Sequence, residues 1–466
     1  MKMVLGILIL VGLHTAQSPA LELVRTRPVP GGQEFAILTK EGDRHLVLWT
    51  QEPSGQWPTM IKQRHFSTFA AAKQTWQKWT ETWPPDLRSQ PAQPRQLREA
   101  EDLTLWPIEN SWSEQWEQKY AQWLEQNVDS RFFSNDLQTD CADAIYALRW
   151  IFARDHRLPM ANRLGGSGWL FSHASVREEW RRLPTHPDWR KDYRFLAALN
   201  YLLQLTYTAS LVRDSYPIEI SARWLRAGAH LSYPQGDTGH NYLVHRLRDG
   251  RDGRLPIALI SSTLPRAFRP LLESDFSDPK QPGSGGFMRF RWPQASGPDW
   301  KLVDAEKMPG HSLEQYSPEF VLNDSFDEAV FNRVAPHRVI DHKRKVESLM
   351  TTLANRYLER QHLVQEGHDR CFPNLCPLGS RDYEDYGTPS RDQRILDLIV
   401  TTQNYVTEHD ETEHTYNTFI WRHKFEIDGE HFRTYEVLLR DLILTWRQGH
   451  YSSDPNQRRE ARWGLH

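Results

Sequence analysis

The chain has 466 residues, of which 39% are hydrophobic and 25% are charged, as is usual for folded soluble domains. Lys and Arg number 57 against 60 Asp and Glu, so the formal net charge at pH 7 is −3. A balance this close to neutral provides no electrostatic basis for binding nucleic acid, and we expect no nucleic-acid partner. The length allows two or three domains.

The first 20 residues have the pattern of a secretory signal peptide. Lys2 provides a positive start, residues 3–13 form an uninterrupted apolar run, and small residues surround a cleavage point near Ala20. The apolar run is shorter than the roughly 20 residues that a membrane span needs. We therefore expect residues 1–20 to be removed, leaving a periplasmic or secreted protein without a membrane span. A retained anchor is the alternative.

Residues 21–84 are predicted to form a small α+β module. Residues 34–39 and 45–49 flank a short Gly-containing turn at residues 41–43, which is typical of a β-hairpin. A helix-like run follows over residues 69–83, in which tryptophans recur at helical spacing. The Pro-, Gln- and Arg-containing residues 85–98 then indicate an extended linker.

The rest of the chain reads as helices, then strands, then helices. The aromatic stripe Trp112, Trp116 and Tyr120 predicts a helix packed on a core. The further predicted segments are a helical tract over 180–214, strands near 218–220, 241–247 and 257–262, and helices over 346–363, 394–406 and 435–446. Because strands and helices are segregated, the sequence predicts an α+β fold. We expect one domain over 99–305 and a helical C-terminal region over 306–466.

Cys141 is the strongest indication of function. It precedes apolar residues at helical spacing, so we expect it in the first turn of a helix that Thr139 or Asp140 caps. Unpaired backbone N–H groups and the positive end of the helix dipole favour a thiolate there, and the same groups can stabilise an oxyanion. Asp140 and Asp143 oppose the thiolate, however, and the thiol shares a helical face with apolar residues. A buried, unreactive cysteine is therefore the alternative.

A second element carries the base that a nucleophilic thiol needs. Gly239-His240 opens a β-like run, and the turn at residues 248–253 leads to a second strand that ends at Ser261 and Ser262. In a hairpin centred near Arg251, His240 lies opposite Ser261 or Ser262, and either hydroxyl could orient the imidazole. A hydrogen-bonded structural histidine is the alternative for His240.

Together these segments resemble the NlpC-type cell-wall cysteine peptidases, a papain-like family. Residues 140–143, Asp-Cys-Ala-Asp, and the later Leu158-Pro159 are similar to the family's nucleophile helix, and Gly239-His240 is similar to its Gly-His strand. The chain has Ala-Asp where the family usually has Ser-Gly after the cysteine. The resemblance implies a papain-like core, in which the nucleophile helix packs on a small antiparallel sheet. It also implies Cys141 as nucleophile, His240 as general base, a polar third residue on the following strand, and cell-wall peptides as substrate.

Three functions follow from this pattern. The first is a thiol hydrolase of peptide or amide bonds, whose substrate is a cell-wall peptide or a protein. This reaction needs no cofactor. The second is a non-catalytic envelope protein that keeps a papain-like scaffold and binds glycan or protein partners through its tryptophan-rich parts. The third is amide transfer of the transglutaminase-like kind, although that group normally has an Asp as third residue. No oligomeric state is predicted.

The two remaining cysteines, Cys371 and Cys376, are close enough in sequence to form a small disulfide loop in an exported protein. A zinc half-site is the alternative, but it lacks evident partner ligands. Residues 409–414 contain two His and two Glu without the spacing that places two ligands on one helical face. We therefore expect neither a metal nor a cofactor.

Overall fold

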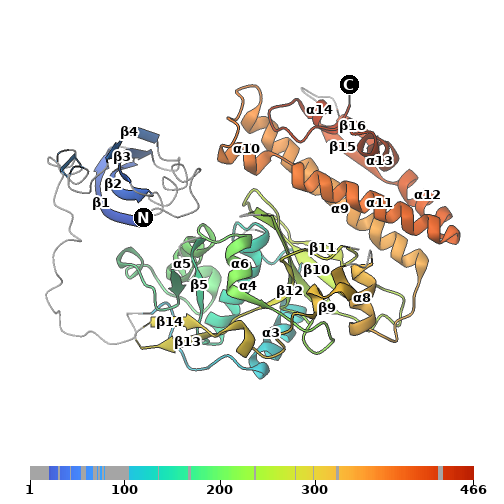
Figure 1. The fold of residues 1–466 in the computed structure, drawn as a ribbon, viewed down its shortest axis with the longest axis horizontal. Helices are drawn as coiled ribbons and strands as arrows, with labels where there is room; N and C mark the ends of the chain where they lie inside the picture. Colours follow the sequence, from blue (N-terminus) through green and yellow to red (C-terminus); the bar gives the residue numbers. More distant parts are fainter. Residues whose placement is uncertain are drawn as a thin grey trace. The chain divides into compact units, whose positions relative to one another are not determined.

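Figure 1 shows the chain in a computed structural model. The structure describes the backbone of four strands between residues 20 and 66, helical residues 71, 74, 75 and 78, and residues 104–465 except 135, 166–168, 236–237, 279, 298, 322–324 and 429–433. The predicted linker at 85–98 and all but the last residue of the predicted signal peptide lie outside the described residues. The chain divides into two compact units, Met1–Glu99 and Ala100–His466. Helices and small antiparallel sheets make it an α+β protein, as predicted.

The N-terminal unit contains a four-stranded antiparallel sheet in which neighbours in sequence are neighbours in space. Its strands are β1 (Ala20–Val29), β2 (Gly32–Glu41), β3 (Arg44–Pro53) and β4 (Thr59–Phe66). Glu41 pairs with Arg44 at the turn between β2 and β3, so the predicted hairpin is confirmed. Strands β1 and β4, which the sequence analysis did not predict, extend it on both sides. Most of the predicted helix over 69–83 lies outside the described residues.

A six-stranded antiparallel sheet organises the second unit. Its order is β11-β10-β9-β8-β12-β7, with β7 (Ser215–Pro217), β8 (His230–Gln235), β9 (Thr238–Leu247), β10 (Ile257–Ser261), β11 (Leu272–Asp275) and β12 (Gly286–Phe290). The strands predicted at 241–247 and 257–262 correspond to β9 and β10. The strand predicted at 218–220 is instead β7, which ends at Pro217, followed by a single bridge from Ile218 to His311.

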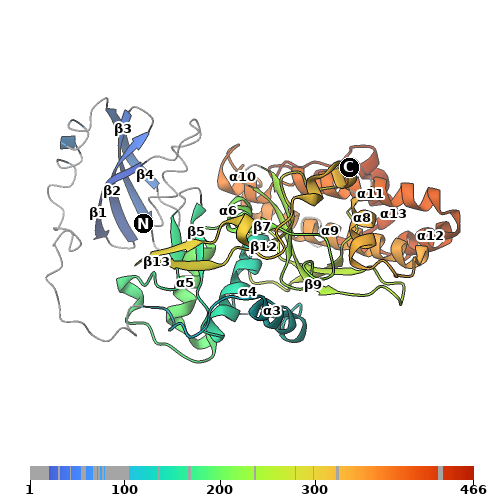
Figure 2. The same cartoon turned by 60° about the horizontal axis from the view of Figure 1, so that its bottom comes forward.

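Helices cover both faces of this sheet. One face is covered by α3 (Glu114–Asn127), α4 (Cys141–Asp155), α5 (Tyr193–Leu203) and α6 (Thr208–Asp214), and Figure 2 shows α3 and α4 together there. Leu243 of β9 belongs to the apolar core on this side. Val244, the next residue, belongs to the core on the other side with α7 (Pro318–Val321) and α8 (Phe326–Val334). Because α4 is apolar nearly all round, it is buried along almost its whole length.

The C-terminal region has a third apolar core of its own. It comprises α9 (His342–Cys371), α10 (Arg381–Tyr386), α11 (Pro389–Glu408), α12 (Glu413–Arg422), β15 (Lys424–Asp428), β16 (Thr434–Leu438), α13 (Leu439–Arg447) and α14 (Arg459–Trp463). The predicted helix over 435–446 is wrong in its first turn, because residues 435–438 pair with β15. Val437 and Tyr435 alternate with polar residues there, which suits a strand.

The second unit also contains two small two-stranded antiparallel sheets. One is formed by β5 (Ala161–Arg163) and β6 (Leu170–Ser172), the other by β13 (Pro293–Ser296) and β14 (Asp299–Leu302). Among the described residues, no single helix has the length and apolarity needed to cross a membrane. The pair α5 and α6 meets those criteria only when both helices are taken together, and a bend of 104° separates them.

Candidate functional site

Cys141 is the first residue of α4, as predicted, and Asp140 is its N-cap. The Asp140 carboxylate accepts hydrogen bonds from the backbone N–H groups of Ala142 and Asp143, both at 2.9 Å. The Asp143 carboxylate accepts in return from the backbone N–H of Asp140 at 3.3 Å. This capping box satisfies two of the first-turn N–H groups that the sequence analysis assigned to the thiolate or an oxyanion. The cap therefore places a negative charge where a nucleophilic thiol needs positive potential.

The Cys141 thiol is buried between α4 and β9, with 4% of the residue exposed. Nδ2 of Asn241 lies 3.7 Å from Sγ and also donates to Oγ1 of Thr208 at 2.8 Å. The thiol faces the carbonyl oxygen of Gly239 at 4.0 Å. Burial, and then the charge of Asp140, raise the pKa of the thiol from 9.0 to about 12, despite opposing effects of Asn241 and Arg391. Cys141 is therefore a protonated thiol at neutral pH.

His240 lies on the opposite side of β9 from Cys141. Successive side chains of a strand point to opposite faces, and the amide of Asn241 reaches Cys141, so His240 points away. Its ring packs instead on Tyr242, with the centroids 4.5 Å apart. Burial, and then the charges of three arginines on α9 and α11, hold the pKa of His240 well below 6.5. Among the contacts of the described residues, the structure brings Asn241 to Cys141 and does not bring His240 there.

Neither predicted serine contacts His240 through a hydrogen bond among the described residues. Ser261 ends β10 and is buried. The hydroxyl of Ser262 donates to the carbonyl oxygen of Thr139 at 3.0 Å and accepts from the Thr139 hydroxyl at 3.2 Å. Ser262 therefore fixes the segment that enters α4. The extra residue of a bulge is His245 of β9, and Leu243 pairs with Ile260, one residue beyond the register of a hairpin centred on Arg251.

A different histidine, His230, lies on the face of β8 and β9 that contacts Cys141. Ser232 pairs with Asn241 across these strands, and His230 lies two residues earlier on β8. Oγ of Ser232, Oδ1 of Asn241 and both ring nitrogens of His230 have no hydrogen-bond partner in the described part of the chain. Burial, and then the charge of Arg149, lower the pKa of His230 to about 3. A base this weak cannot deprotonate a thiol of raised pKa at neutral pH.

The sequence analysis missed Asn241, Thr208 and Arg391 as neighbours of the thiol. Asn241 directly follows His240, which the sequence analysis selected. The two residues differ in which face of β9 their side chains lie on. Arg391 lies on α11, and its Nη2 donates to Oγ1 of Thr263 at 3.2 Å. Arg391 lies 250 residues after Cys141, so no local sequence pattern could have indicated that the two are close.

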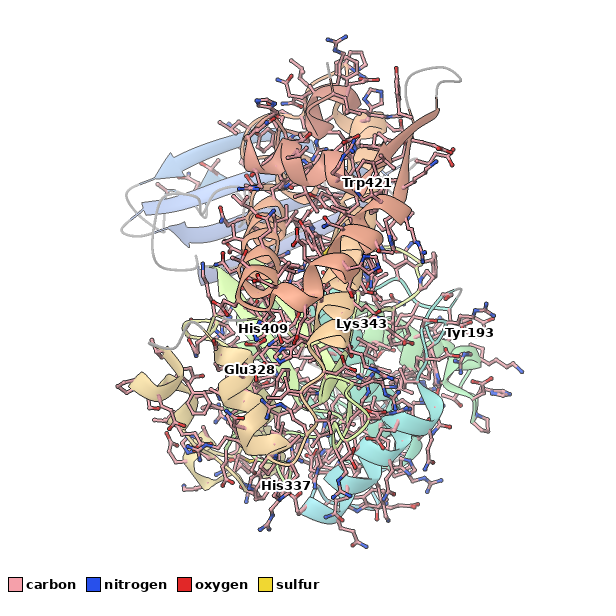
Figure 3. All side chains as sticks on the ribbon, turned by 90° about the vertical axis from the view of Figure 1, so that its right-hand side faces the viewer. Tyr193, Glu328, His337, Lys343, His409 and Trp421 are labelled. Carbon is pink, nitrogen blue, oxygen red and sulfur yellow. A yellow bond between two sulfur atoms is a disulfide. The ribbon has the colours of Figure 1, made fainter. Side chains whose placement is uncertain are left out.

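Cys371 and Cys376 form a disulfide with an S–S distance of 2.07 Å, which confirms the predicted loop and leaves Cys141 as a free, buried cysteine. A disulfide fits an oxidising compartment. Among the described residues, no group of three or more His, Cys, Asp or Glu side chains is placed to hold a metal ion. His409, labelled in Figure 3, stacks its ring on that of His342 at 4.0 Å, where α11 ends beside the start of α9.

Comparison of the chain with known protein families, with curated proteins and with solved structures found no match. The chemistry available at Cys141 is therefore judged from its geometry. A protonated, buried thiol that faces an amide, with no basic imidazole beside it, is suited to packing and hydrogen bonding rather than to nucleophilic attack.

Proposed function

We propose that this protein is a non-catalytic exported protein with a papain-like scaffold that binds a cell-wall glycan, peptide or protein partner. The observation that carries the proposal is the burial of the Cys141 thiol against Asn241, with His240 on the other side of the strand. The segment around Cys141 supports the scaffold part, because it resembles the nucleophile helix of the NlpC-type peptidases. The apolar N-terminal run and the Cys371–Cys376 disulfide support export.

Exposed aromatic rings support a binding role. Trp169 and Trp421 are 55% and 53% exposed, although large aromatic side chains are usually mostly buried. Such rings offer flat apolar surface next to a polar N–H group, which suits contact with sugars and with peptide side chains. The guanidinium of Arg440 lies 4.0 Å from the Trp421 ring centroid and adds a cation to that surface.

The first test is alkylation of Cys141 by iodoacetamide, which reacts with the thiolate. A pKa raised from 9.0 to about 12 lowers the thiolate fraction at pH 8 about a thousandfold. We expect the native full-length chain to react at least about a hundredfold more slowly than the same chain unfolded in urea. The disulfide keeps Cys371 and Cys376 out of the reaction. A native rate equal to or above the unfolded rate would contradict the proposal.

The second arm measures binding and turnover together. We expect the wild-type chain and Cys141→Ala to sediment equally with purified peptidoglycan, and neither to release peptides from muropeptides. Release of peptides by the wild type that is lost in Cys141→Ala would overturn the non-catalytic proposal.

A thiol hydrolase of cell-wall peptides is the second candidate. It is favoured by the position of Cys141 as the first residue of α4 and by the charge of Arg391, which lowers the pKa of the thiol. In this case the thiolate would be stabilised by a guanidinium rather than by His240. Incorporation of an amine in place of hydrolysis would instead indicate amide transfer of the transglutaminase-like kind.

A further inference from the structure

A cavity of 510 Å³ lies between the end of α3, strands β9 to β11 and the side of α9. Figure 1 shows α9 beside β11, the edge strand of the sheet, and Nδ2 of Asn355 on α9 donates to the backbone carbonyl oxygen of Glu273 on β11 at 3.0 Å. Small-molecule sites have volumes of about 300–1,000 Å³, so this cavity suits a ligand of the size of a short peptide. We call it the α3–α9 groove, and its charged lining residues are Glu125, Asp129, Arg246, Arg248, Glu273 and Asp275.

Acidic side chains outnumber basic ones in the groove by four to two. One pair is neutral in itself, because Nη1 of Arg248 lies 2.7 Å from the carboxylate of Asp275. The second guanidinium, that of Arg246, donates from Nη2 to the backbone carbonyl oxygen of Glu125 at 3.5 Å. Among the described residues, the carboxylates of Glu125 and Glu273 have no ion pair within 4.0 Å. The groove therefore has an excess of two negative charges.

A second cavity adjoins the groove and does not change this excess. Asn127 and Asp129 line both cavities. The remaining charged residues of the second lining are two acidic and two basic ones, Asp155, Asp188, Arg131 and Arg190. The ion pairs that continue from them again contain two acidic and two basic residues, Asp136, Asp192, Arg154 and Lys191. The negative charge of the α3–α9 groove is therefore not cancelled from this side.

The wall of the groove also offers hydrogen-bond acceptors. The last turn of α3 lines it, so the negative end of the dipole of this helix lies there. His245, the bulged residue of β9, hydrogen-bonds to the backbone of Val128 and Leu124, and its Nε2 is a buried atom without a partner in the described part of the chain. Burial, and then the charge of Arg246, lower the pKa of His245, which keeps the imidazole neutral at pH 7. Its Nε2 is then an acceptor.

We propose that the α3–α9 groove binds a peptide of the protein's partner through a protonated amine, whose charge is met by the carboxylates of Glu125, Asp129 and Glu273. An ammonium group supplies one positive charge and three donors, which complement a wall of acceptors with excess negative charge. The proposal rests on the binding role proposed above and names the chemistry of the peptide partner. It does not depend on the state of Cys141, which is not part of the lining.

The test is calorimetric titration of the full-length chain at pH 7 and low salt. The probe is the tripeptide acetyl-Ala-Lys-Ala-amide, and its matched control is the same peptide acetylated on the lysine amine. We expect saturable binding of the first peptide. Acetylation should weaken binding about tenfold or more, because it removes the positive charge. Equal affinity for the two peptides, or no binding of the first, would overturn the proposal.

Variants of the groove test which charges act. Replacing both Glu125 and Glu273 by Gln should weaken binding of the lysine peptide about tenfold or more, because charge-assisted hydrogen bonds are lost. The matched control is Glu413→Gln, an exposed carboxylate at the start of α12 outside the lining, which should bind as the wild type does. Equal affinity of the double variant and this control would contradict the proposal.

Arg246→Gln covers the case that the double variant does not fold. It removes the unpaired cation of the groove, so it should bind the lysine peptide several-fold more tightly than the wild type does. Misfolding cannot produce such a gain. An affinity equal to or below that of the wild type would show that the charge of the groove does not govern binding.

Sedimentation with purified peptidoglycan separates this proposal from the proposed function. A wild-type chain that sediments but does not bind the lysine peptide would overturn the role of the groove and leave the proposed function standing. A wild-type chain that binds the lysine peptide but does not sediment would support the groove and contradict a cell-wall partner.

Discussion

The character of Cys141 is set by two neighbouring residues. Asp140 caps α4 and turns the first-turn N–H groups towards its own carboxylate, which removes the electrostatic advantage of a helix N-terminus. Asn241 takes the position facing the thiol, which an enzyme would give to a base. Both effects favour a protonated thiol. The reactivity of Cys141 therefore depends on the orientation of its neighbouring side chains rather than on its position in the helix.

Glu117 shows the same dependence on neighbours with the opposite result. Its carboxylate accepts from Nη1 of Arg149 at 2.9 Å and from Nε1 of Trp292 at 2.7 Å, and Nη2 of Arg289 lies 3.1 Å away. Burial on its own would raise the pKa of this carboxyl. The two guanidinium groups outweigh burial and lower the pKa from 4.5 to about 2.

We predict that Glu117 makes stability depend on pH in acid. Because its folded pKa is below its unfolded pKa, its contribution is complete above pH 4.5 and is lost as the pH falls towards 2. A shift of this size corresponds to about 3 kcal/mol. Glu117→Gln should therefore lower the unfolding free energy by about 3 kcal/mol at pH 6 and by much less near pH 2.5, as measured by urea denaturation. A deficit that is the same at both pH values would count against this assignment.

At the scale of elements, α9 and α11 are joined by a buried ion pair. Nε of Arg360 on α9 lies 2.6 Å from the carboxylate of Asp392 on α11, and neither side chain is more than 2% exposed. The guanidinium also packs on the rings of Trp446 and Trp463, at 4.7 and 4.8 Å from their centroids. The pair therefore joins α9 and α11 within the third apolar core.

We predict that Asp392→Asn lowers the unfolding free energy by about 3 kcal/mol or more, because it leaves the buried Arg360 without its counter-charge. The matched control is Asp382→Asn. Asp382 pairs with Arg370 between α10 and α9, but those side chains are 36% and 56% exposed. The control should cost no more than about 1 kcal/mol. The unfolding free energy of both variants is measured by chemical denaturation. Equal decreases would mean that burial does not determine how much an ion pair contributes to stability.

At the scale of the whole molecule, the structure combines two compact units with a small covalent constraint. The second unit has three apolar cores, two on the faces of the six-stranded sheet and one among the C-terminal helices. The disulfide lies at the end of α9, within the part of the chain that holds the third core. A disulfide persists in an oxidising compartment, so the stability of this region depends on the redox conditions around the protein.

We predict that replacing both disulfide cysteines by serine lowers the unfolding free energy by about 2 kcal/mol, the amount expected for closing so short a loop. Dithiothreitol should reproduce this loss in the wild-type chain and should change nothing further in the double variant. Urea denaturation with and without reductant is the measurement. If reductant has no effect on the wild type, the disulfide does not constrain the unfolded chain in the expected way.

Local pattern was sufficient for features that depend on a few neighbouring residues. The first turn of α4 at Cys141 follows from a capping Asp140 before an apolar run. The β2–β3 hairpin follows from a short Gly-containing turn, and the Cys371–Cys376 disulfide follows from the close spacing of the two cysteines in a chain that we expect to be exported. The start of α4 and the hairpin turn are each decided by a short stretch of sequence, which contains the necessary information.

Tertiary structure alone decided what surrounds those features. Whether His240 or Asn241 faces Cys141 depends on which side of β9 the helix α4 packs, and shifting the register by one residue would exchange them. The charge of Arg391 on α11 acts on the Cys141 thiol 250 residues earlier in the sequence, and no local pattern predicts an interaction over such a separation. Sequence by itself determined several of the elements and the thiol's place on a helix. Packing determined which side chains share a face, and therefore which chemistry is available.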